Sequence, residues 1–67
     1  MQSILTKRER EIFKALIQNQ TTKEIAEQLK ISEKTVRNHI SNVMGKLGAV
    51  SRIQAVLELI KLKELEL

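Results

Sequence analysis

The sequence predicts an all-α fold of four short helices, on three observations. Proline is absent, glycine occurs twice and one aromatic residue is present among 67 residues, which disfavours β-hairpins and aromatic-lined sheets. Apolar residues recur at steps of three and four, the period of a helix and not of a strand. Four hydroxyl side chains each precede such a stretch, where they can cap a helix. A chain of this length has room for one small core, so we expect residues 1–67 to form a single domain.

Helix boundaries follow from the caps and from the residues that end each apolar period. The residues expected to cap helices are Thr6, Thr21, Ser32 and Ser51. All but Ser32 have a glutamate or glutamine three positions later, the spacing of a capping box. Asn19 and Gly48 follow apolar stretches, at positions where a left-handed residue ends a helix. We therefore expect a frayed tail over 63–67 and helices over about 7–18, 22–29, 33–47 and 52–62.

The second and third expected helices have the lengths and separation of a helix-turn-helix: a short helix, a turn of about three residues and a longer helix. Ala26 falls on the inner face of the shorter one, where a small side chain lets two helices cross closely. Val36 lies ten residues later, on the inner face of the longer one. This pair alone is weak support, but the caps, the turn length and the charge of the longer helix favour the same motif.

Positive charge is concentrated in the middle of the chain. Residues 28–52 carry five basic side chains against one acid, Glu33, whereas the segments before and after them sum to +1 and −1. A local basic field of this kind usually meets phosphate or another polyanion. A solvated basic face is the alternative at a total net charge of only +4.

The residues that the chain lacks disfavour several classes of function. Cysteine is absent and His39 is the only histidine, so the usual nitrogen and sulfur ligands cannot form a structural zinc site. There is no glycine-rich phosphate loop and no Ser/His/Asp set, so we expect no metal, no cofactor and no catalytic residue. No apolar run approaches the roughly 20 residues of a membrane span, and the start lacks a secretory signal. We expect a cytoplasmic protein without membrane contact.

Five stretches of the sequence resemble the LuxR/FixJ family of DNA-binding domains. They extend over nearly the whole chain and are Leu5–Glu9, Thr22–Ala26, Ile31–Ile40, Lys46–Gly48 and Ser51–Arg52. The resemblance implies a four-helix LuxR-type helix-turn-helix domain. It also implies a bacterial transcription regulator that binds double-stranded DNA as a dimer, with RNA polymerase as a further candidate partner.

Within this family the sequence is most similar to stand-alone spore regulators, which implies control of sporulation or spore-coat genes. Many members have glycine at the position of Asn19, and a generic helix-turn-helix often has glycine at that of Lys30. Members usually carry an N-terminal receiver or ligand-binding domain, whereas Met1 lies directly before the DNA-binding unit here. We therefore expect either a stand-alone regulator or a fragment of a longer protein.

The outer face of the third helix carries the residues expected to contact base pairs. The residues opposite its apolar face are Lys34, Arg37, Asn38 and Ser41. A guanidinium matches the two major-groove acceptors of guanine, and a carboxamide matches the donor and acceptor of adenine. The resemblance places base contacts at Arg37, Asn38 and Ser41, and Lys34 is a further candidate. The alternative is a set of merely solvated polar side chains.

Phosphate contacts are expected chiefly near helix N-termini, where free amide groups and the helix dipole favour an anion. The candidates, including two further out on the third helix, are Thr22, Lys23, Ser32, Thr35, Asn42 and Lys46. For the hydroxyl residues, plain helix capping is at least as good an interpretation. Arg8 and Arg52 can pair with nearby carboxylates instead of DNA.

The last helix has apolar residues on two sides. One side carries Ile53, Val56, Leu57 and Ile60, and the other carries Ala55, Leu59 and Leu62. One side can cover the core, and the exposed strip that remains is typical of an interface. We expect a homodimer with the first set at its seam, which would hold two recognition helices about 34 Å apart. In the competing interpretation, the strip binds another protein and the chain is a protein-interaction module.

Overall fold

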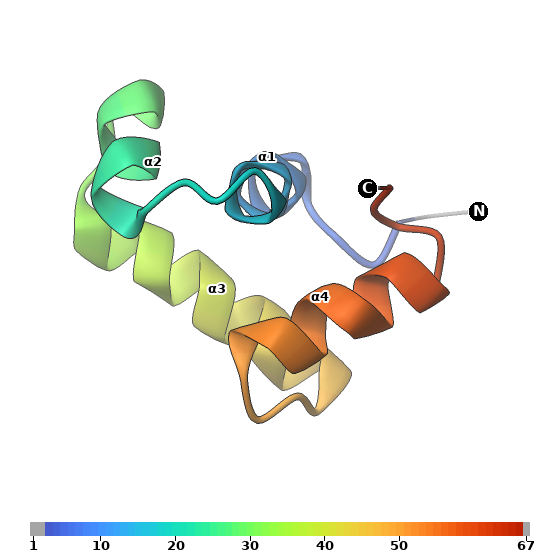
Figure 1. Cartoon of the computed structure of the whole chain (residues 1–67). Coiled ribbons are helices and arrows are strands. Elements are labelled where there is room, and N and C mark those ends of the chain that lie inside the picture. Colours follow the sequence, from blue (N-terminus) through green and yellow to red (C-terminus); the bar gives the residue numbers. More distant parts are fainter. Residues whose placement is uncertain (1–2, 67) are drawn as a thin grey trace.

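The computed structural model describes residues 3–66 and consists, over that range, of four α-helices (Figure 1). The helices are α1 (Lys7–Ile17), α2 (Thr22–Leu29), α3 (Glu33–Leu47) and α4 (Arg52–Lys61). The predicted all-α class is confirmed. The bounds of α2 and α3 are those predicted, and α1 and α4 each end one residue earlier. No helix in the described range is long and apolar enough to cross a membrane.

Side-chain caps start each helix. The hydroxyl oxygens that accept a backbone N–H from three residues ahead are those of Thr6, Thr21, Ser32 and Ser51. The two predicted glutamate boxes form, and each satisfies an amide that has no partner within its helix. The box expected at Ser51 does not form. There the backbone is more extended, with φ −148°, and the Gln54 side chain accepts the amide of Val50 instead, at 2.9 Å.

Left-handed residues turn the chain after each helix. Gly48 has φ 65° and Asn19 has φ 65°, as the sequence predicts. Lys30 ends α2 with φ 58°, a left-handed conformation in which glycine, which has no Cβ, would be less strained. Lys63 has φ 60° and directs the tail back after α4.

One apolar core lies between the helices, and α3 packs against each of the other three (Figure 1). The prediction that Ala26 and Val36 face inward in the helix-turn-helix is confirmed, since Val36 is fully buried and Ala26 is 6% exposed. The buried apolar residues are Leu5, Ile12, Phe13, Ile25, Ala26, Val36, Ile40, Val43, Ala55, Leu59 and Leu65. They come from all four helices and from both flanking segments.

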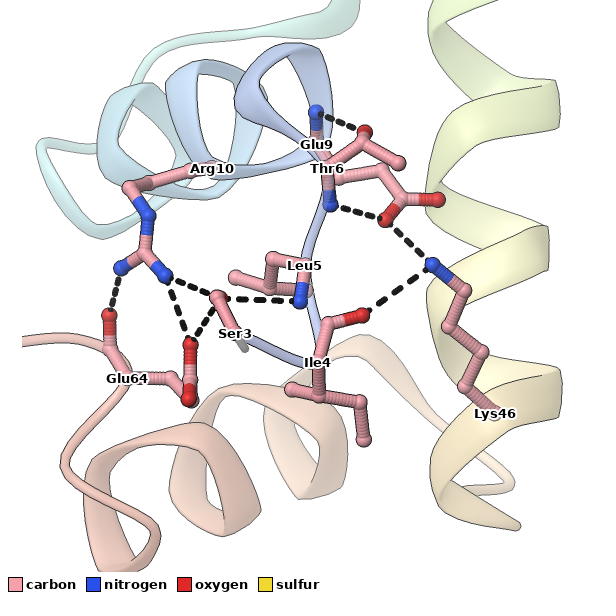
Figure 2. Close-up of polar contacts among 8 residues, drawn as sticks. All are labelled: Ser3, Ile4, Leu5, Thr6, Glu9, Arg10, Lys46 and Glu64. Atoms are coloured by element: carbon pink, nitrogen blue, oxygen red, sulfur yellow. Dashed lines mark hydrogen bonds and ion pairs between the residues drawn. The ribbon is translucent and has the colours of Figure 1, made fainter. Parts of the chain in front are cut away.

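The tail after α4 is packed, so the predicted fraying is wrong for residues 63–66. Leu65 is buried in the core, and the Arg10 guanidinium donates to the Glu64 carboxylate at 2.6 Å (Figure 2). The same guanidinium also donates to the Glu64 carbonyl, and the Ser3 hydroxyl donates to the Glu64 carboxylate. Leu67, which the prediction included, lies outside the described residues.

A buried carboxylate joins the start of α1 to the end of α3. Glu9 is 3% exposed, and its Oε1 accepts from Lys46 Nζ at 2.6 Å and from the Thr6 amide at 2.9 Å (Figure 2). Burial acts to raise the pKa of Glu9, but the hydrogen bonds from Lys46 and Thr6 outweigh it. The pKa of Glu9 therefore lies below its ordinary value of 4.5.

Glu9→Gln is expected to reduce the free energy of unfolding at pH 7 by about 1–3 kcal/mol, because the buried side chain at position 9 loses its charge-assisted bond with Lys46, whose own side chain is 36% exposed. Since the pKa of Glu9 is lower in the folded than in the unfolded chain, the ionised carboxylate stabilises the fold. This contribution is complete above the ordinary value of 4.5 and is lost as the pH falls through the folded value. The difference between the two proteins should therefore shrink below pH 4.5. Urea unfolding across this pH range measures it, with Glu11→Gln, at a carboxylate that is 40% exposed, as the control. If the unmodified protein and the Glu9→Gln variant lost stability in parallel as the pH falls, the stabilising role of the ionised Glu9 carboxylate would be contradicted.

Candidate nucleic-acid interface

The outer face of α3 consists of four exposed polar side chains. These are Lys34, Arg37, Asn38 and Ser41. The opposite face is fixed in the core by Val36, Ile40 and Val43, which are at most 2% exposed. Because successive helical residues are separated by about 100°, burial of one face directs the other to solvent. The structure thus brings the four residues predicted to contact bases onto one accessible surface.

Arg37 is held only loosely in the described part of the chain. Its side chain is 54% exposed, and its Nη1 lies 3.8 Å from Oε1 of Glu33, one turn earlier on α3. Exposed ion pairs of this kind contribute little, about 0.3–0.5 kcal/mol. The guanidinium can therefore turn toward a base edge at small cost.

The phosphate candidates divide into free and engaged side chains. Lys23 and Asn42 are exposed, and Thr22 is half-buried in the first turn of α2. The Ser32 hydroxyl accepts the Thr35 amide at 3.0 Å and lies 2.9 Å from the Thr35 hydroxyl. Capping is therefore confirmed for Ser32, and contact of these residues with phosphate stays a prediction.

Lys46 serves the fold rather than pointing freely outward. Its ammonium group donates to Glu9 at 2.6 Å and to the Ile4 carbonyl at 3.2 Å (Figure 2). No local pattern predicts this pairing, because Glu9 lies 37 positions earlier. A DNA phosphate would have to compete with the buried Glu9 carboxylate for the ammonium group of Lys46. Contact of Lys46 with phosphate therefore becomes less favourable and stays a prediction.

The two apolar sides of α4 have different surroundings. Ala55 and Leu59 are fully buried, so their side covers the core. On the other side Ile53 is 75% exposed and Leu57 54% exposed. The other two residues expected at the seam, Val56 and Ile60, are half-buried against the core. Leu62, expected on the covering side, is instead 52% exposed, at the C-cap of the helix.

An apolar groove runs between the end of α1 and α4. Its apolar lining comprises Leu16, Ile17, Ile53, Val56 and Leu57. The groove extends the exposed strip of α4 onto α1. The local sequence pattern does not predict this groove, because it does not show which helix crosses α1 there.

A comparison with family models decides the kinship of the chain. The model described as bacterial regulatory proteins of the luxR family matches residues 3–59. The chain belongs to this family. The match includes α1, α2, α3 and most of α4, so the predicted resemblance is confirmed. The chain is accordingly a DNA-binding transcription regulator of the helix-turn-helix type, in a family of regulators rather than enzymes.

Individual relatives agree with the family. The chain is 67% identical over 64 residues to the spore germination protein GerE of Bacillus subtilis (strain 168), covering 96% of this chain and 86% of GerE. It is 47% identical over 58 residues to the transcriptional regulatory protein DegU of Brevibacillus brevis, covering 87% of this chain and 25% of DegU. The solved structure of the transcription factor GerE matches with a TM-score of 0.94 and 62% identity, over 97% of each chain. The four-helix LuxR-type fold is thus confirmed.

Arg37→Ala is expected to weaken binding to the preferred duplex by about 1–3 kcal/mol and to relax the base preference at one position, because a bidentate contact to guanine is lost. Fluorescence anisotropy with the preferred duplex and with random-sequence duplex measures both effects. Arg8→Ala is a matched control, since Arg8 is also paired, at 3.6 Å from Glu11, and its side chain is 41% exposed, but it lies on α1. Equal losses on both duplexes would show that Arg37 contacts only the DNA backbone.

Proposed function

We propose that this regulator reads a roughly palindromic DNA site as a homodimer, with the outer face of α3 in the major groove and α4 at the dimer seam. The observation that carries the proposal is the accessible guanidinium of Arg37 beside the Asn38 carboxamide on a helix whose other face is locked in the core. A major groove about 12 Å wide admits one α-helix. Base contacts then come from Arg37, Asn38 and Ser41, with Lys34 at the edge.

Charge around α3 supports the same orientation. Residues 28–52 carry a net charge of +4, the whole excess of the chain. The start of α2 adds Lys23 beside free helical amides, which favour a phosphate. These groups position the helix on the DNA backbone, whereas the outer face of α3 supplies sequence preference.

Apolar exposure on α4 supports a two-fold dimer. Ile53 and Leu57 are large, exposed and one turn apart, and the groove beside them reaches Leu16 and Ile17 of α1. A two-fold axis would pair this strip with its copy and leave both α3 helices on one side. Recognition helices about 34 Å apart would enter successive major grooves.

The similarity to the spore germination protein GerE supports a role in the control of sporulation or spore-coat genes. The chain spans 86% of GerE but only 25% of DegU, so GerE is the better guide to its biological setting. A cytoplasmic location, where the chromosome is accessible, is part of the proposal. RNA polymerase is a further candidate partner, because a regulator bound at a promoter lies next to it.

Binding should depend steeply on salt. With six to ten phosphate contacts per dimer, the logarithm of the affinity should fall with the logarithm of salt concentration by about 0.9 for each contact, because neutralised phosphates release counterions. Anisotropy titrations between about 50 and 200 mM salt measure the slope. A salt-independent affinity for duplex DNA would contradict the proposal.

Leu57→Glu is expected to shift the dimer to monomers, because a charge placed in an apolar seam loses hydration without a partner. We expect the dimer dissociation constant to rise by at least about 30-fold, which corresponds to about 2 kcal/mol. Sedimentation equilibrium measures the change. Leu62→Glu is the matched control, since Leu62 is equally exposed but lies outside the proposed seam. An unchanged dimer in the Leu57 variant would remove this face of α4 from the seam.

A further inference from the structure

The first turn of α3 carries one acidic side chain on an otherwise basic surface. Glu33 is the only acid in residues 28–52. Its side chain is 49% exposed, and its Oε1 lies 3.8 Å from Nη1 of Arg37. In a complex with DNA this carboxylate would lie close to phosphate groups, which repel it. Its position beside the principal base-reading residue therefore needs an explanation.

Helix capping does not explain Glu33. In α1 and α2 the first-turn glutamate stands three residues after the cap and accepts the amide of the cap residue. Glu33 instead follows Ser32 directly, and Thr35 stands at the third position, where its hydroxyl bonds with that of Ser32. A negative charge in the first turn does favour the helix dipole. That effect is available throughout the turn, whereas the spacing of four residues is what brings Glu33 to Arg37.

We propose that Glu33 is a specificity-determining residue, which restrains Arg37 and selectively weakens binding to unmatched DNA. The inference rests on the proposed function of α3. A guanidinium has five N–H donors, and a bidentate contact with guanine uses two of them. On a matched site Arg37 can therefore keep its contact with Glu33 while it reads the base.

On unmatched DNA, the Arg37 guanidinium has different groups available to contact. With no guanine edge in place, Arg37 can gain only by swinging to a phosphate group on the backbone. That movement breaks the ion pair and leaves the Glu33 carboxylate uncompensated beside the phosphates. Glu33 thus lowers affinity for random DNA more than affinity for the matched site, and the ratio of the two affinities rises.

Glu33→Gln tests the inference, because it removes the charge and preserves the shape of the side chain. The two probes are a duplex recovered by selection from random DNA and a random-sequence duplex pool of the same length. On the pool we expect the variant to bind roughly threefold more tightly than the unmodified chain, from the released ion pair and the lost repulsion. On the selected duplex we expect a change within about twofold, since the pair is retained there.

Salt dependence gives a second readout that a merely structural role would not move. If Arg37 is released to contact phosphate, the salt slope on the random pool should steepen by about 0.9 per subunit, with no change on the selected duplex. Glu11→Gln is the matched control. It makes the same change in net charge, at a carboxylate that is 40% exposed and lies 3.6 Å from Arg8 on α1. We expect it to alter binding to both probes by the same factor.

The same substitution in an Arg37→Ala background completes the test. Because Glu33 discriminates through Arg37, its removal in this background should tighten binding to the random pool and to the selected duplex by the same factor, from the lost repulsion alone. A gain on the pool that only matches Glu11→Gln in the unmodified background, or a larger gain on the pool than on the selected duplex that persists without Arg37, would overturn the inference. Loss of affinity for the selected duplex alone would also overturn it, because Glu33 would then read a base itself. An unmodified chain that shows no preference for the selected duplex would instead overturn the proposed function. Circular dichroism at the assay temperature verifies that each variant is folded.

Discussion

Helix α3 has two faces, of which one packs in the core and the other presents the predicted DNA-contacting side chains. Its inner side chains, with Val36 and Val43 fully buried, pack against all three other helices. Because one rigid backbone carries both faces, the core contacts that hold α3 also fix the direction of Arg37 and Asn38. Side chains presented on a fixed helix lose less freedom on binding than those on a mobile loop. The position of α3 therefore determines both how the core packs and where the predicted DNA-contacting side chains point.

A chain of 67 residues buries only a small core, and two polar ties supplement it. Glu9 and Lys46 join the start of α1 to the end of α3, and Arg10 and Glu64 join α1 to the tail (Figure 2). Both ties connect segments far apart in sequence. Neither tie uses any of the four side chains predicted to contact bases.

Local chemistry made the helices predictable, and long-range contacts account for what was missed. Caps and apolar spacing depend on neighbours within four residues, so the bounds of α2 and α3 and the outward direction of Arg37 could be read directly. The packed tail could not, because Glu64 meets Arg10 across 54 positions. The contact between Lys46 and the buried Glu9 could not be predicted either, because 37 positions separate the two residues. The two apolar sides of α4 were recognised, but only tertiary packing shows which of them covers the core.

An amide chemical-shift titration of the protein with its selected duplex locates the DNA-contact surface without altering any residue. We expect the largest shifts at Arg37, Asn38 and Ser41 and at the start of α2, with small shifts on α1. Shifts confined to α1 or to the exposed strip of α4, with the outer face of α3 unchanged, would contradict this expectation.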